Sequence, residues 1–462
     1  MGPVIVSANG SQPRLSLAPI ADDDMARRLL TDSAAQGLVR FDAAGQIVPG
    51  VAERWIVTDE GRTYIFRLRD TSWADGRPMR AAEVVAILRR RLQQRARNPL
   101  APYLTALDSI VEMTPEVIQV ELARPRPDLL KLFAQPDMAI IHPVRGIGSG
   151  PMQVVGKIGQ VTRLRPIPDP NRAADEQEDP QPEDDVLLIA ERPAAGVARF
   201  AARRSDLFTG GTVGEWPLLT AAGIDAAEVR LDPAAGLFGL AIVRPEGFLA
   251  TPENRGALAL AIDRAALVQG FTADWLPAED LLPAALDSAS PPAKAPWQAV
   301  AAADRRATAR ARVDAWLAAG NESLTVRIAL PASAGGTLLW ARIAADLYAV
   351  GIRPVRVAWD AETDLRLIDA VAPFDSGRWY LGHACQPCSE GASQAIEAAR
   401  MAPSLAERAR AIAAADRLLA EDIAFVPLAR PLRWSLVAPR LRTWQANERA
   451  WHPLNGVRRD PN

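Results

Sequence analysis

The stretch WIVTDEGRTYIFRLRDTSWADGRPMRAAEVV, from Trp55 to Val85, predicts two strands, two turns and the start of a helix. Tyr64, Phe66 and Leu68 recur at every second position, which is the period of a half-buried strand. Glycines in the turns DEG and ADGRP supply positive φ angles, and AAEVVAILRRRL then places apolar residues at helical spacing. The stretch contains no serine–histidine pair, metal-ligand cluster or phosphate loop.

Length and composition indicate a large globular protein. A chain of 462 residues is too long for one hydrophobic core, so several lobes are expected. Hydrophobic residues make up 49% and charged residues 23%, which is ordinary for a globular protein and excludes a disordered chain. No apolar run is long enough to span a bilayer. The start MGPVIVSANG lacks the basic residues and apolar core of a secretory signal, so a signal segment is expected to be absent from this chain.

Charge gives no indication of a nucleic-acid partner. The formal net charge is −2, which provides no overall attraction to nucleic acid or anionic lipid. The cluster Arg89-Arg90-Arg91, with Arg95 and Arg97, has no aromatic residues interleaved with it. We therefore interpret it as a solvated helix face and expect no nucleic-acid binding.

The rest of the chain alternates strand-like and helical segments. GSGPMQVVGKIGQVTRLRPIP is turn-rich and strand-like, and the acidic, proline-rich tract 169–185 after it is expected to be an exposed loop that buries nothing. LFGLAIVRP predicts a buried strand, and Thr251 with Pro252 predicts a helix start. SLTVRIALP, GGTLLWARIAADLYAVG and IRPVRVAW form a strand–helix–strand unit, and IAFVPLA and LRWSLVA are strands near the end. These patterns predict an α/β protein.

Common catalytic motifs are missing from the sequence. The G-x-S-x-G, P-loop and H-E-x-x-H patterns do not occur. The three histidines, His142, His383 and His452, are isolated from one another. We therefore expect a protein that is not an enzyme and needs no cofactor, with a hydrolase kept as an alternative.

The only two cysteines, Cys385 and Cys388, lie together in HACQPCSEG. A disulfide between them would fit an oxidising compartment. Two free thiols are a second interpretation. A metal or redox site is a third, but one C-x-x-C motif with His383 supplies fewer ligands than a tetrahedral site needs, and we expect no metal.

Tryptophan is more frequent than tyrosine, with twelve residues against four, and several tryptophans lie in turn-rich segments. Trp216 follows FTGGTVGE, and Trp379 lies in DSGRWYLGH. Broad flat side chains beside glycines suit a pocket that encloses a small molecule. For each tryptophan taken singly, however, core packing is the favoured interpretation.

The segments from Leu38 to Val85 resemble the signature of the family 5 extracellular solute-binding proteins, the dipeptide, oligopeptide and nickel receptors of bacterial ABC importers. In that family a PG-A--W element precedes an aromatic strand, an LR pair, W-DG-P and a helix. The matching residues here are Pro49, Gly50, Ala52, Trp55, Tyr64, Phe66, Leu68, Arg69, Trp73, Asp75, Gly76, Pro78, Glu83 and Val84. GSGP, RSDLFTGG, NRGALALAIDRAALV and AERARAIAAADRLLAEDIAFVPL resemble later family elements in the same order.

This resemblance implies an α/β fold of the periplasmic-binding-protein type II class (cluster C), a flytrap with two main lobes and an inserted third domain. Lobe I would comprise residues 1–23, 147–242 and 430–462. Lobe II would be the inserted block 24–146 with the family signature, and lobe III would be residues 243–429. The ligand would lie between lobes I and III, with closure driven by contacts made only in the closed state.

Two departures from the family pattern stand out. Arg80 replaces a helix-capping threonine, which is expected to weaken that cap. Peptide-binding members carry an aspartate for the peptide ammonium, where this chain has Ala372 or Pro373, with Asp369 and Asp375 nearby. The second departure weighs against the usual peptide-amine clamp and favours a sugar, an opine-like, a modified or an apolar ligand.

The resemblance implies an extracytoplasmic substrate-binding protein of an ABC importer. Such a protein would capture a small solute, peptide-like or another organic ligand, and deliver it to an ABC permease in the inner membrane. It would be a monomer in the periplasm, or lipid-anchored outside the cytoplasmic membrane. A periplasmic sensor or chaperone-like binding protein is the alternative, and a hydrolase on the same scaffold is a further one.

Seven residues are predicted as ligand contacts, two from lobe I and five from lobe III. They are Asn9, Trp216, Arg366, Asp369, Asp375, Arg378 and Trp379. An arginine among them would pair with an anionic group of the ligand, an aspartate with a cationic or hydroxyl group, and the tryptophans would stack on the ligand. Replacing Trp379 by alanine is then expected to weaken ligand binding and to leave thermal stability nearly intact.

Overall fold

The computed structural model describes residues 2–11, 13–21, 23–93, 97–168, 180–284, 286–321 and 323–457. By its internal contacts the chain divides into two compact units. Unit 1 comprises Met1–Gly211, Leu218–Pro233 and Arg433–Asn462. Unit 2 comprises Thr212–Pro217 and Ala234–Leu432. The finer division into three lobes stays a prediction.

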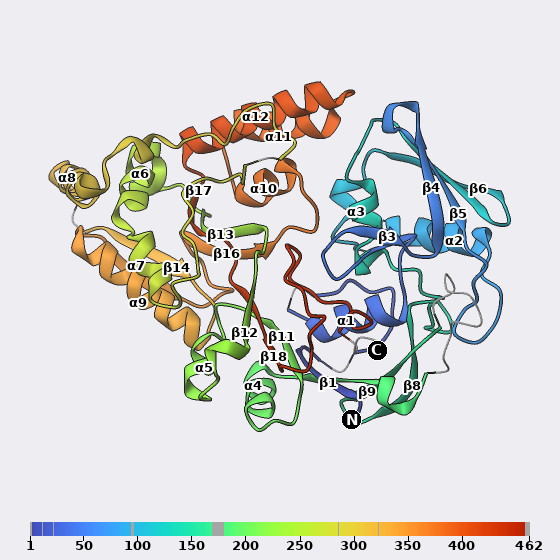
Figure 1. The fold of residues 1–462 in the computed structure, drawn as a ribbon. Coiled ribbons are helices and arrows are strands. Elements are labelled where there is room, and N and C mark those ends of the chain that lie inside the picture. The colour runs from blue at the N-terminus through green and yellow to red at the C-terminus, as the bar shows by residue number, and fades with distance from the viewer. Residues whose placement is uncertain are drawn as a thin grey trace. The chain divides into compact units, whose positions relative to one another are not determined.

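Unit 1 is built on a seven-stranded sheet with the order β12-β18-β11-β1-β10-β9-β8 (Figure 1). Its strands are β1 (Val4–Asn9), β8 (Met152–Ile158), β9 (Val161–Pro166), β10 (Val186–Glu191), β11 (Leu207–Gly211), β12 (Val229–Asp232) and β18 (Arg433–Val437). The central strand β1 pairs in parallel with β10 and β11, and the other pairs are antiparallel. Helices α1 (Met25–Ala34) and α4 (Pro193–Ala201) both contact β1.

The opening stretch contributes β5 and most of β4 to a second, four-stranded sheet in unit 1, with the order β4-β5-β7-β6. Its strands are β4 (Ala52–Thr58), β5 (Thr63–Leu68), β6 (Leu107–Thr114) and β7 (Val117–Leu122), and the helices beside it are α2 (Ala81–Leu92) and α3 (Leu129–Phe133). A short hairpin, β2 (Val39–Phe41) with β3 (Ile47–Pro49), precedes the sheet. Tyr64, Phe66 and Leu68 are all buried, so the predicted alternation is confirmed.

The signature residues at the start of α2 are part of the scaffold. Trp73 is buried, and its indole N–H donates to Glu83 Oε2 at 3.2 Å. The same Glu83 oxygen accepts from the Arg80 backbone N–H at 3.4 Å. The side chain of Arg80 makes no cap hydrogen bond, as the missing threonine predicted. One carboxylate therefore holds both the buried tryptophan and the helix start.

The expectation that the arginines at the end of α2 form a solvated face is only partly correct. Arg89 and Arg90 are exposed, but Arg91 is only 3% exposed, because its position falls on the apolar face of the helix with Leu88. Its guanidinium donates to Ala139 O at 2.8 Å and to Leu17 O at 3.2 Å. Burial lowers the pKa of Arg91 to about 10. The solvated-face interpretation is wrong for this arginine, and Arg95 lies outside the described residues.

The acidic tract is described only at its end, since residues 169–179 lie outside the described part of the chain. Asp185, its last residue, is fully buried beside β10. The Nε of Arg165 donates to Asp185 Oδ1 at 2.8 Å, and Arg163 forms a second ion pair with the same carboxylate. The expectation that the tract buries nothing is therefore wrong at Asp185.

Unit 2 is built on a five-stranded sheet with the order β15-β14-β16-β13-β17. Its strands are β13 (Gly236–Ile242), β14 (Thr325–Ala329), β15 (Arg353–Val357), β16 (Leu365–Val371) and β17 (Phe425–Ala429). Its helices are α6 (Pro252–Ala261), α7 (Arg264–Gln269), α8 (Arg305–Ala318), α9 (Ala334–Ala349), α10 (Gly377–Ala384), α11 (Glu390–Met401) and α12 (Leu405–Asp422). The short helix α5 (Pro217–Ala221) spans the boundary between the units.

Local signals in unit 2 are confirmed. The strands β14 and β15 are parallel and flank α9 in sequence, as the strand–helix–strand pattern predicted. Thr251 is the N-cap of α6 and accepts from the Asn254 N–H at 3.4 Å. Ser404 is the N-cap of α12 and accepts from the Glu407 N–H at 3.2 Å. Both caps satisfy backbone donors that a helix start leaves open.

The buried Asp416 on α12 makes unit 2 sensitive to pH. Its Oδ2 accepts a hydrogen bond from the Ala293 N–H at 2.7 Å. Burial raises the pKa of Asp416 from 3.8 to about 6; the Ala293 bond opposes this shift, and the charge of Asp280 adds to it. The folded protein thus binds this proton more tightly than the unfolded chain. The contribution of Asp416 to the free energy of unfolding therefore falls as the pH rises from about 4 to about 6.

Replacing Asp416 by asparagine should raise the free energy of unfolding by up to about 3 kcal/mol at pH 7 and by almost nothing at pH 4. The amide keeps an oxygen for the Ala293 N–H and removes the buried charge. Urea unfolding of both proteins from pH 4 to pH 7 measures the difference. Asp314→Asn, at an exposed carboxylate on α8, is the matched control and should change little at any pH. A pH-independent difference for Asp416→Asn would contradict the prediction.

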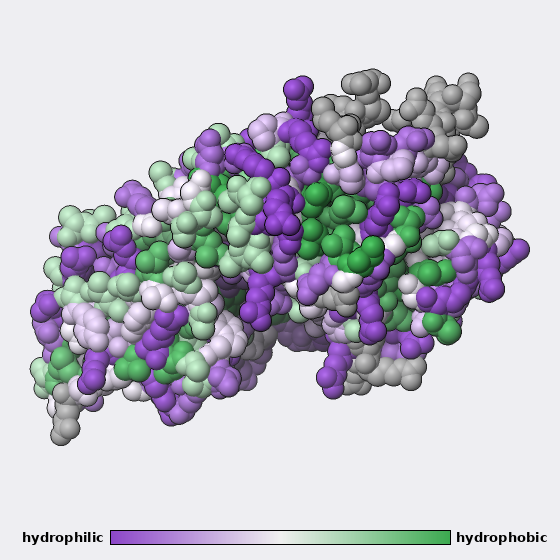
Figure 2. All heavy atoms as spheres, turned by 90° about the horizontal axis from the view of Figure 1, so that it is seen from below, coloured by the Kyte–Doolittle hydropathy of each residue, from purple (hydrophilic) through white to green (hydrophobic). Residues whose placement is uncertain are grey.

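The surface carries scattered apolar side chains. Figure 2 shows hydrophilic residues spread over the visible face with hydrophobic groups between them. Among the large apolar side chains that are exposed are Ile56, Ile158 and Trp359, at 60%, 84% and 51%. Single exposed apolar groups are common on globular proteins, so exposure alone does not mark a binding site.

Candidate ligand-binding site

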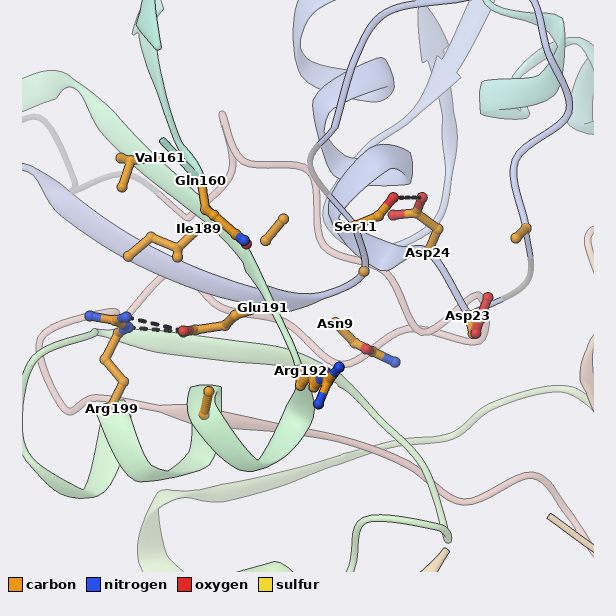
Figure 3. A pocket seen from close by; sticks show the side chains of 14 residues that line it. Asn9, Ser11, Asp23, Asp24, Gln160, Val161, Ile189, Glu191, Arg192 and Arg199 are labelled. Carbon is orange, nitrogen blue, oxygen red and sulfur yellow. Dashed lines mark hydrogen bonds and ion pairs between the residues drawn. The ribbon is translucent and has the colours of Figure 1, made fainter. Parts of the chain in front are cut away.

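A cavity of about 960 Å³ lies in unit 1, at the carboxyl ends of β1 and β10 (Figure 3). Its walls include Asn9, Ser11, Asp23, Gln160, Glu191 and Arg192. This volume is within the range of roughly 300–1,000 Å³ that small-molecule sites occupy. Of the predicted ligand contacts, Asn9 lines this cavity.

The fold explains why polar groups meet there. Asn9 ends β1 and Glu191 ends β10, and the two strands are parallel neighbours with these residues in register. Carboxyl ends of parallel strands meet at one edge of a sheet, where ligands commonly bind in α/β proteins. Arg192 directly follows β10 and is the N-cap of α4, whose first residue is Pro193.

The carboxylate of Glu191 lines the cavity and is held in place by hydrogen bonds to neighbouring side chains. Arg199 donates to its two carboxylate oxygens at 2.9 and 3.0 Å, and the Ser7 hydroxyl donates at 2.7 Å. Burial alone would raise the pKa of Glu191, but the hydrogen bonds from Arg199 and Ser7 outweigh it and hold this pKa below its usual value. Glu191 therefore stays ionised and positions Arg199.

Asp24 also serves the structure. Its Oδ1 accepts from the Arg27 N–H at 3.1 Å and caps α1, and its Oδ2 accepts from the Ser11 hydroxyl at 3.2 Å. By contrast, the side chains of Arg192 and Asp23 have no hydrogen bond or ion pair with any described residue. Arg192 and the N-terminus of α4 both favour an anionic group, whereas Asp23 favours a cationic or hydroxyl group.

Residue-pattern reasoning missed Asp23, Gln160 and Arg192. Arg192 carried a usable signal, because a strand end followed by proline at the first position of a helix places the intervening residue at the sheet edge. Gln160 lies in the turn between β8 and β9 and carried no such signal. Only the pairing of β9 with β10 brings it to the cavity.

Five of the predicted contacts lie in one strand–turn–helix segment of unit 2. Arg366 and Asp369 lie on β16, Asp375 lies in the turn after it, and Arg378 and Trp379 lie on α10. The first three are partly exposed, whereas Arg378 and Trp379 are 7% and 3% exposed. The role of all five as ligand contacts stays a prediction.

The burial of Trp379 changes one expectation. Its ring contacts Tyr380 edge-on, with the centroids 5.0 Å apart, and lies 4.2 Å from the ring of His383. A side chain packed in this way supports the interior of unit 2. The expectation that Trp379→Ala leaves thermal stability nearly intact is therefore at odds with the structure.

An ion-pair network holds the start of α10. Asp287 accepts from the Gly377 N–H at 2.7 Å and from the Ser376 hydroxyl at 2.9 Å. Its Oδ2 also accepts from Arg408 Nη2 at 3.0 Å. The side chain of Arg408 on α12 is only 3% exposed. A carboxylate from outside the helix thus takes the capping role that Ser376 does not fill.

Trp216 lies in unit 2, although it was expected in lobe I. The segment Thr212–Pro217 is joined to the rest of unit 2 through the Gly335 N–H, which donates to Gly214 O at 2.9 Å. A side chain on Gly335 would collide with the Val213 carbonyl. The indole N–H of Trp216 donates to Phe271 O at 3.0 Å. Its role as a ligand contact stays a prediction.

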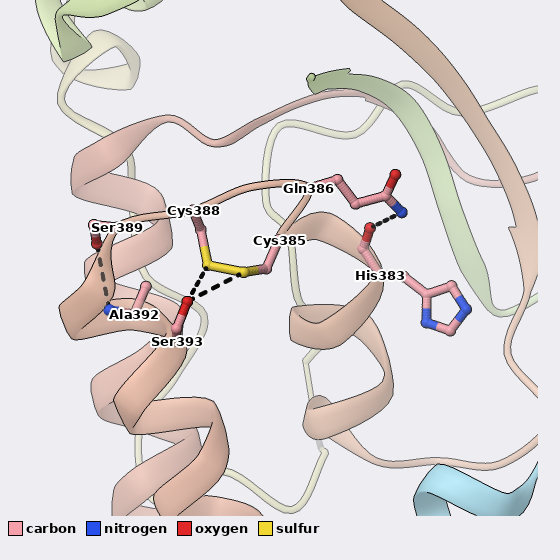
Figure 4. Close-up of a disulfide and its surroundings, with 7 residues drawn as sticks. All are labelled: His383, Cys385, Gln386, Cys388, Ser389, Ala392 and Ser393. Atoms are coloured by element: carbon pink, nitrogen blue, oxygen red, sulfur yellow. Dashed lines mark hydrogen bonds between the residues drawn. A yellow bond between two sulfur atoms is a disulfide. The ribbon is translucent and has the colours of Figure 1, made fainter. Parts of the chain in front are cut away.

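The disulfide interpretation of the two cysteines is confirmed. Cys385 and Cys388 are bonded to each other, with their Cα atoms 4.8 Å apart (Figure 4). The hydroxyl of Ser393 on α11 lies 3.4 Å from Cys388 Sγ and 3.8 Å from Cys385 Sγ. The bond closes the connection between α10 and α11.

The described residues contain neither a metal-ligand cluster nor a membrane-spanning helix. No group of three or more histidine, cysteine, aspartate or glutamate side chains is arranged to hold a metal ion within the described ranges. In the same part of the chain, no helix has both the length and the apolar character needed to cross a membrane.

Known proteins share this fold and part of this sequence. The "Probable deoxycholate-binding periplasmic protein YgiS" of Escherichia coli (strain K12) is 41% identical over 70 residues, which span 15% of this chain and only 13% of that protein. The murein tripeptide binding protein MppA of Escherichia coli superposes with a TM-score of 0.79 at 16% identity, over 98% of both chains. Haemophilus influenzae OppA, in complex with RPPGFSPFR, superposes with a TM-score of 0.77 at 17% identity, also over 98% of both.

These similarities confirm the predicted fold class, an α/β protein of the type II periplasmic-binding-protein class. The family model described as "Bacterial extracellular solute-binding proteins, family 5 Middle" matches residues 46–354, which is more than half of the chain. The chain therefore belongs to the family 5 bacterial extracellular solute-binding proteins.

Proposed function

We propose that this protein is an extracytoplasmic receptor that captures a small solute and delivers it to the permease of an ABC importer. The family match over residues 46–354 is the observation that carries this proposal. The cavity of unit 1 supports it, since Asn9, Arg192 and Asp23 offer an amide, a cation and an anion to a ligand. Contacts from unit 2 through Arg366 and Asp369 remain part of the proposal.

The solute we propose is a small organic molecule with at least one charged or hydrogen-bonding group. The similar proteins are named for different cargoes: a murein tripeptide for MppA and deoxycholate for YgiS. Because members of one family are named for such different cargoes, the specificity of each member must depend on its own residues. The polar cavity of unit 1 favours a ligand that carries charge.

Location and partners follow from the family. We propose a periplasmic protein, or one lipid-anchored outside the cytoplasmic membrane, that works as a monomer with an inner-membrane ABC permease. It binds its solute without changing it, so it is a receptor and not an enzyme. The names of the relatives, which include the word periplasmic, support the location.

Native mass spectrometry of the protein purified under mild conditions tests this function. We expect a co-purified small molecule that denaturation releases unchanged. Thermal-shift measurements with tripeptides, deoxycholate and monosaccharides then rank the solute classes. Turnover of a peptide or an ester would contradict the receptor function and would indicate that the protein is a hydrolase. No retained ligand and no shift with any class would contradict solute binding.

Replacing Arg192 by glutamine should weaken binding of the retained solute about tenfold, because a charge-assisted hydrogen bond is lost while the fold is kept. Isothermal titration calorimetry of the ligand-stripped proteins measures the affinity. Arg204→Gln removes the same charge from an exposed position of unit 1 and is the matched control. Equal affinities for the two variants would exclude the cavity as a ligand site.

A further inference from the structure

Arg366 on β16 is a cation that none of the described residues neutralises. Its Nε is buried without a hydrogen-bond partner. Within the described ranges its guanidinium forms no ion pair and no hydrogen bond. The contact recorded for it is with an aromatic ring, that of Trp359, whose centroid lies 5.7 Å from the guanidinium carbon.

Two other arginines whose side chains are partly buried in the same sheet, Arg327 and Arg356, are neutralised or hydrogen-bonded. Arg327 on β14 donates to Asp364 Oδ1 at 3.0 Å and to Glu362 at 3.0 Å. Arg356 on β15 donates to Pro331 O at 2.7 Å and to the Thr337 hydroxyl at 3.0 Å. Arg327 and Arg356 thus both have protein acceptors, whereas Arg366 has none among the described residues.

Trp359 is presented from a loop that is held in place. Glu362 and Asp364 of this loop both pair with Arg327, and the Arg327 N–H donates to Asp364 Oδ2 at 2.8 Å. The Thr363 hydroxyl adds a bond to Leu365 O at 2.7 Å. Although the loop is fixed, the indole of Trp359 is 51% exposed. A rigid loop that exposes a large aromatic side chain loses little entropy when a ligand binds.

We propose that Arg366 and Trp359 form a subsite for a carboxylate-bearing solute with a flat or apolar body. The guanidinium would bind the carboxylate through its planar fork of N–H donors, and the indole would cover the apolar body. One guanidinium balances one negative charge, which suits a carboxylate better than a doubly charged phosphate. The subsite names a solute class within the proposed receptor function and rests on it.

Calorimetric titration of the full chain with 1-naphthoate and with 1-naphthamide tests this subsite. The two probes share the flat body and differ in the negative charge. We expect the acid to bind and the amide to bind at least about tenfold more weakly. Arg366→Gln should remove that preference, and Trp359→Ala should weaken both probes. Arg366→Lys, which keeps the charge without the planar fork, should fall between the wild type and Arg366→Gln.

Arg353→Gln, at an exposed arginine of β15, is the matched control and should bind both probes like the wild type. No binding of 1-naphthoate, equal binding of acid and amide, or unchanged binding by Arg366→Gln would each overturn the subsite. A failure of the subsite can be distinguished from a failure of the receptor function. A solute retained in native mass spectrometry that is indifferent to Arg366→Gln leaves the receptor intact, and naphthoate binding without any retained solute leaves the subsite intact.

Discussion

Replacing Trp379 by alanine should lower the free energy of unfolding by about 3 to 5 kcal/mol, because a large aromatic side chain leaves a cavity in a packed interior. Trp379 is 3% exposed and contacts the rings of Tyr380 and His383. Trp359→Ala is the matched control in the same unit. Its indole is 51% exposed, so the same substitution should change stability by less than about 0.5 kcal/mol.

Urea unfolding followed by circular dichroism measures both variants under the same conditions. A loss for Trp379→Ala as small as that for Trp359→Ala would show that Trp379 is not part of the packed interior. It would also restore the stacking role predicted from the sequence. The expected result instead leaves Trp359, and not Trp379, as the tryptophan of this pair that a solute can reach.

Replacing Asp287 by alanine should cost about 3 to 5 kcal/mol, because it leaves the buried guanidinium of Arg408 without its carboxylate. Arg408 is 3% exposed at its side chain and donates to Asp287 Oδ2 at 3.0 Å. The same substitution removes the acceptor for the Gly377 N–H at the start of α10. The segment from Asp375 to Trp379 should then lose its fixed conformation.

A double-mutant cycle separates the ion pair from the helix cap. Arg408→Met removes the buried charge and keeps an apolar chain of similar length. Asp287→Ala combined with Arg408→Met should be more stable than Asp287→Ala alone, because the buried positive charge is removed together with the carboxylate that it pairs with. Equal stability of the single and the double variant would contradict this explanation. Amide hydrogen exchange at the start of α10 reports the loss of the cap.

Much of the fold follows from local sequence. The alternation of Tyr64, Phe66 and Leu68 predicted β5, and Thr251 with Pro252 predicted the start of α6. These signals depend on neighbours within a few residues, so they need no knowledge of the tertiary structure. The family signature extended the same reasoning to the α/β fold class.

Burial was harder to predict than secondary structure. Arg91 and Trp379 were assigned to exposed roles from their residue types and neighbours, and both are buried. Asp185 was placed in a solvated tract and is fully buried between arginines. Whether a polar or amphipathic side chain is buried depends on the partners that other segments bring to it.

The candidate site shows the same limit. Of the residues that line the cavity of unit 1, sequence reasoning named Asn9, but it missed Arg192. The parallel pairing of β1 with β10 brings Asn9 beside Arg192, although more than half of the residues of unit 1 lie between them in the sequence. No periodic pattern encodes such a distant pair.

The sequence by itself determined the family, the fold class, the helix starts and the strand periods of this protein, because these depend on interactions between residues close together in the chain. The tertiary structure alone decided which charges are neutralised. Glu191 is paired with Arg199, and Arg366 has no acidic partner among the described residues. Neutralisation depends on distances of a few ångströms between strands and helices, and the folded backbone sets those distances.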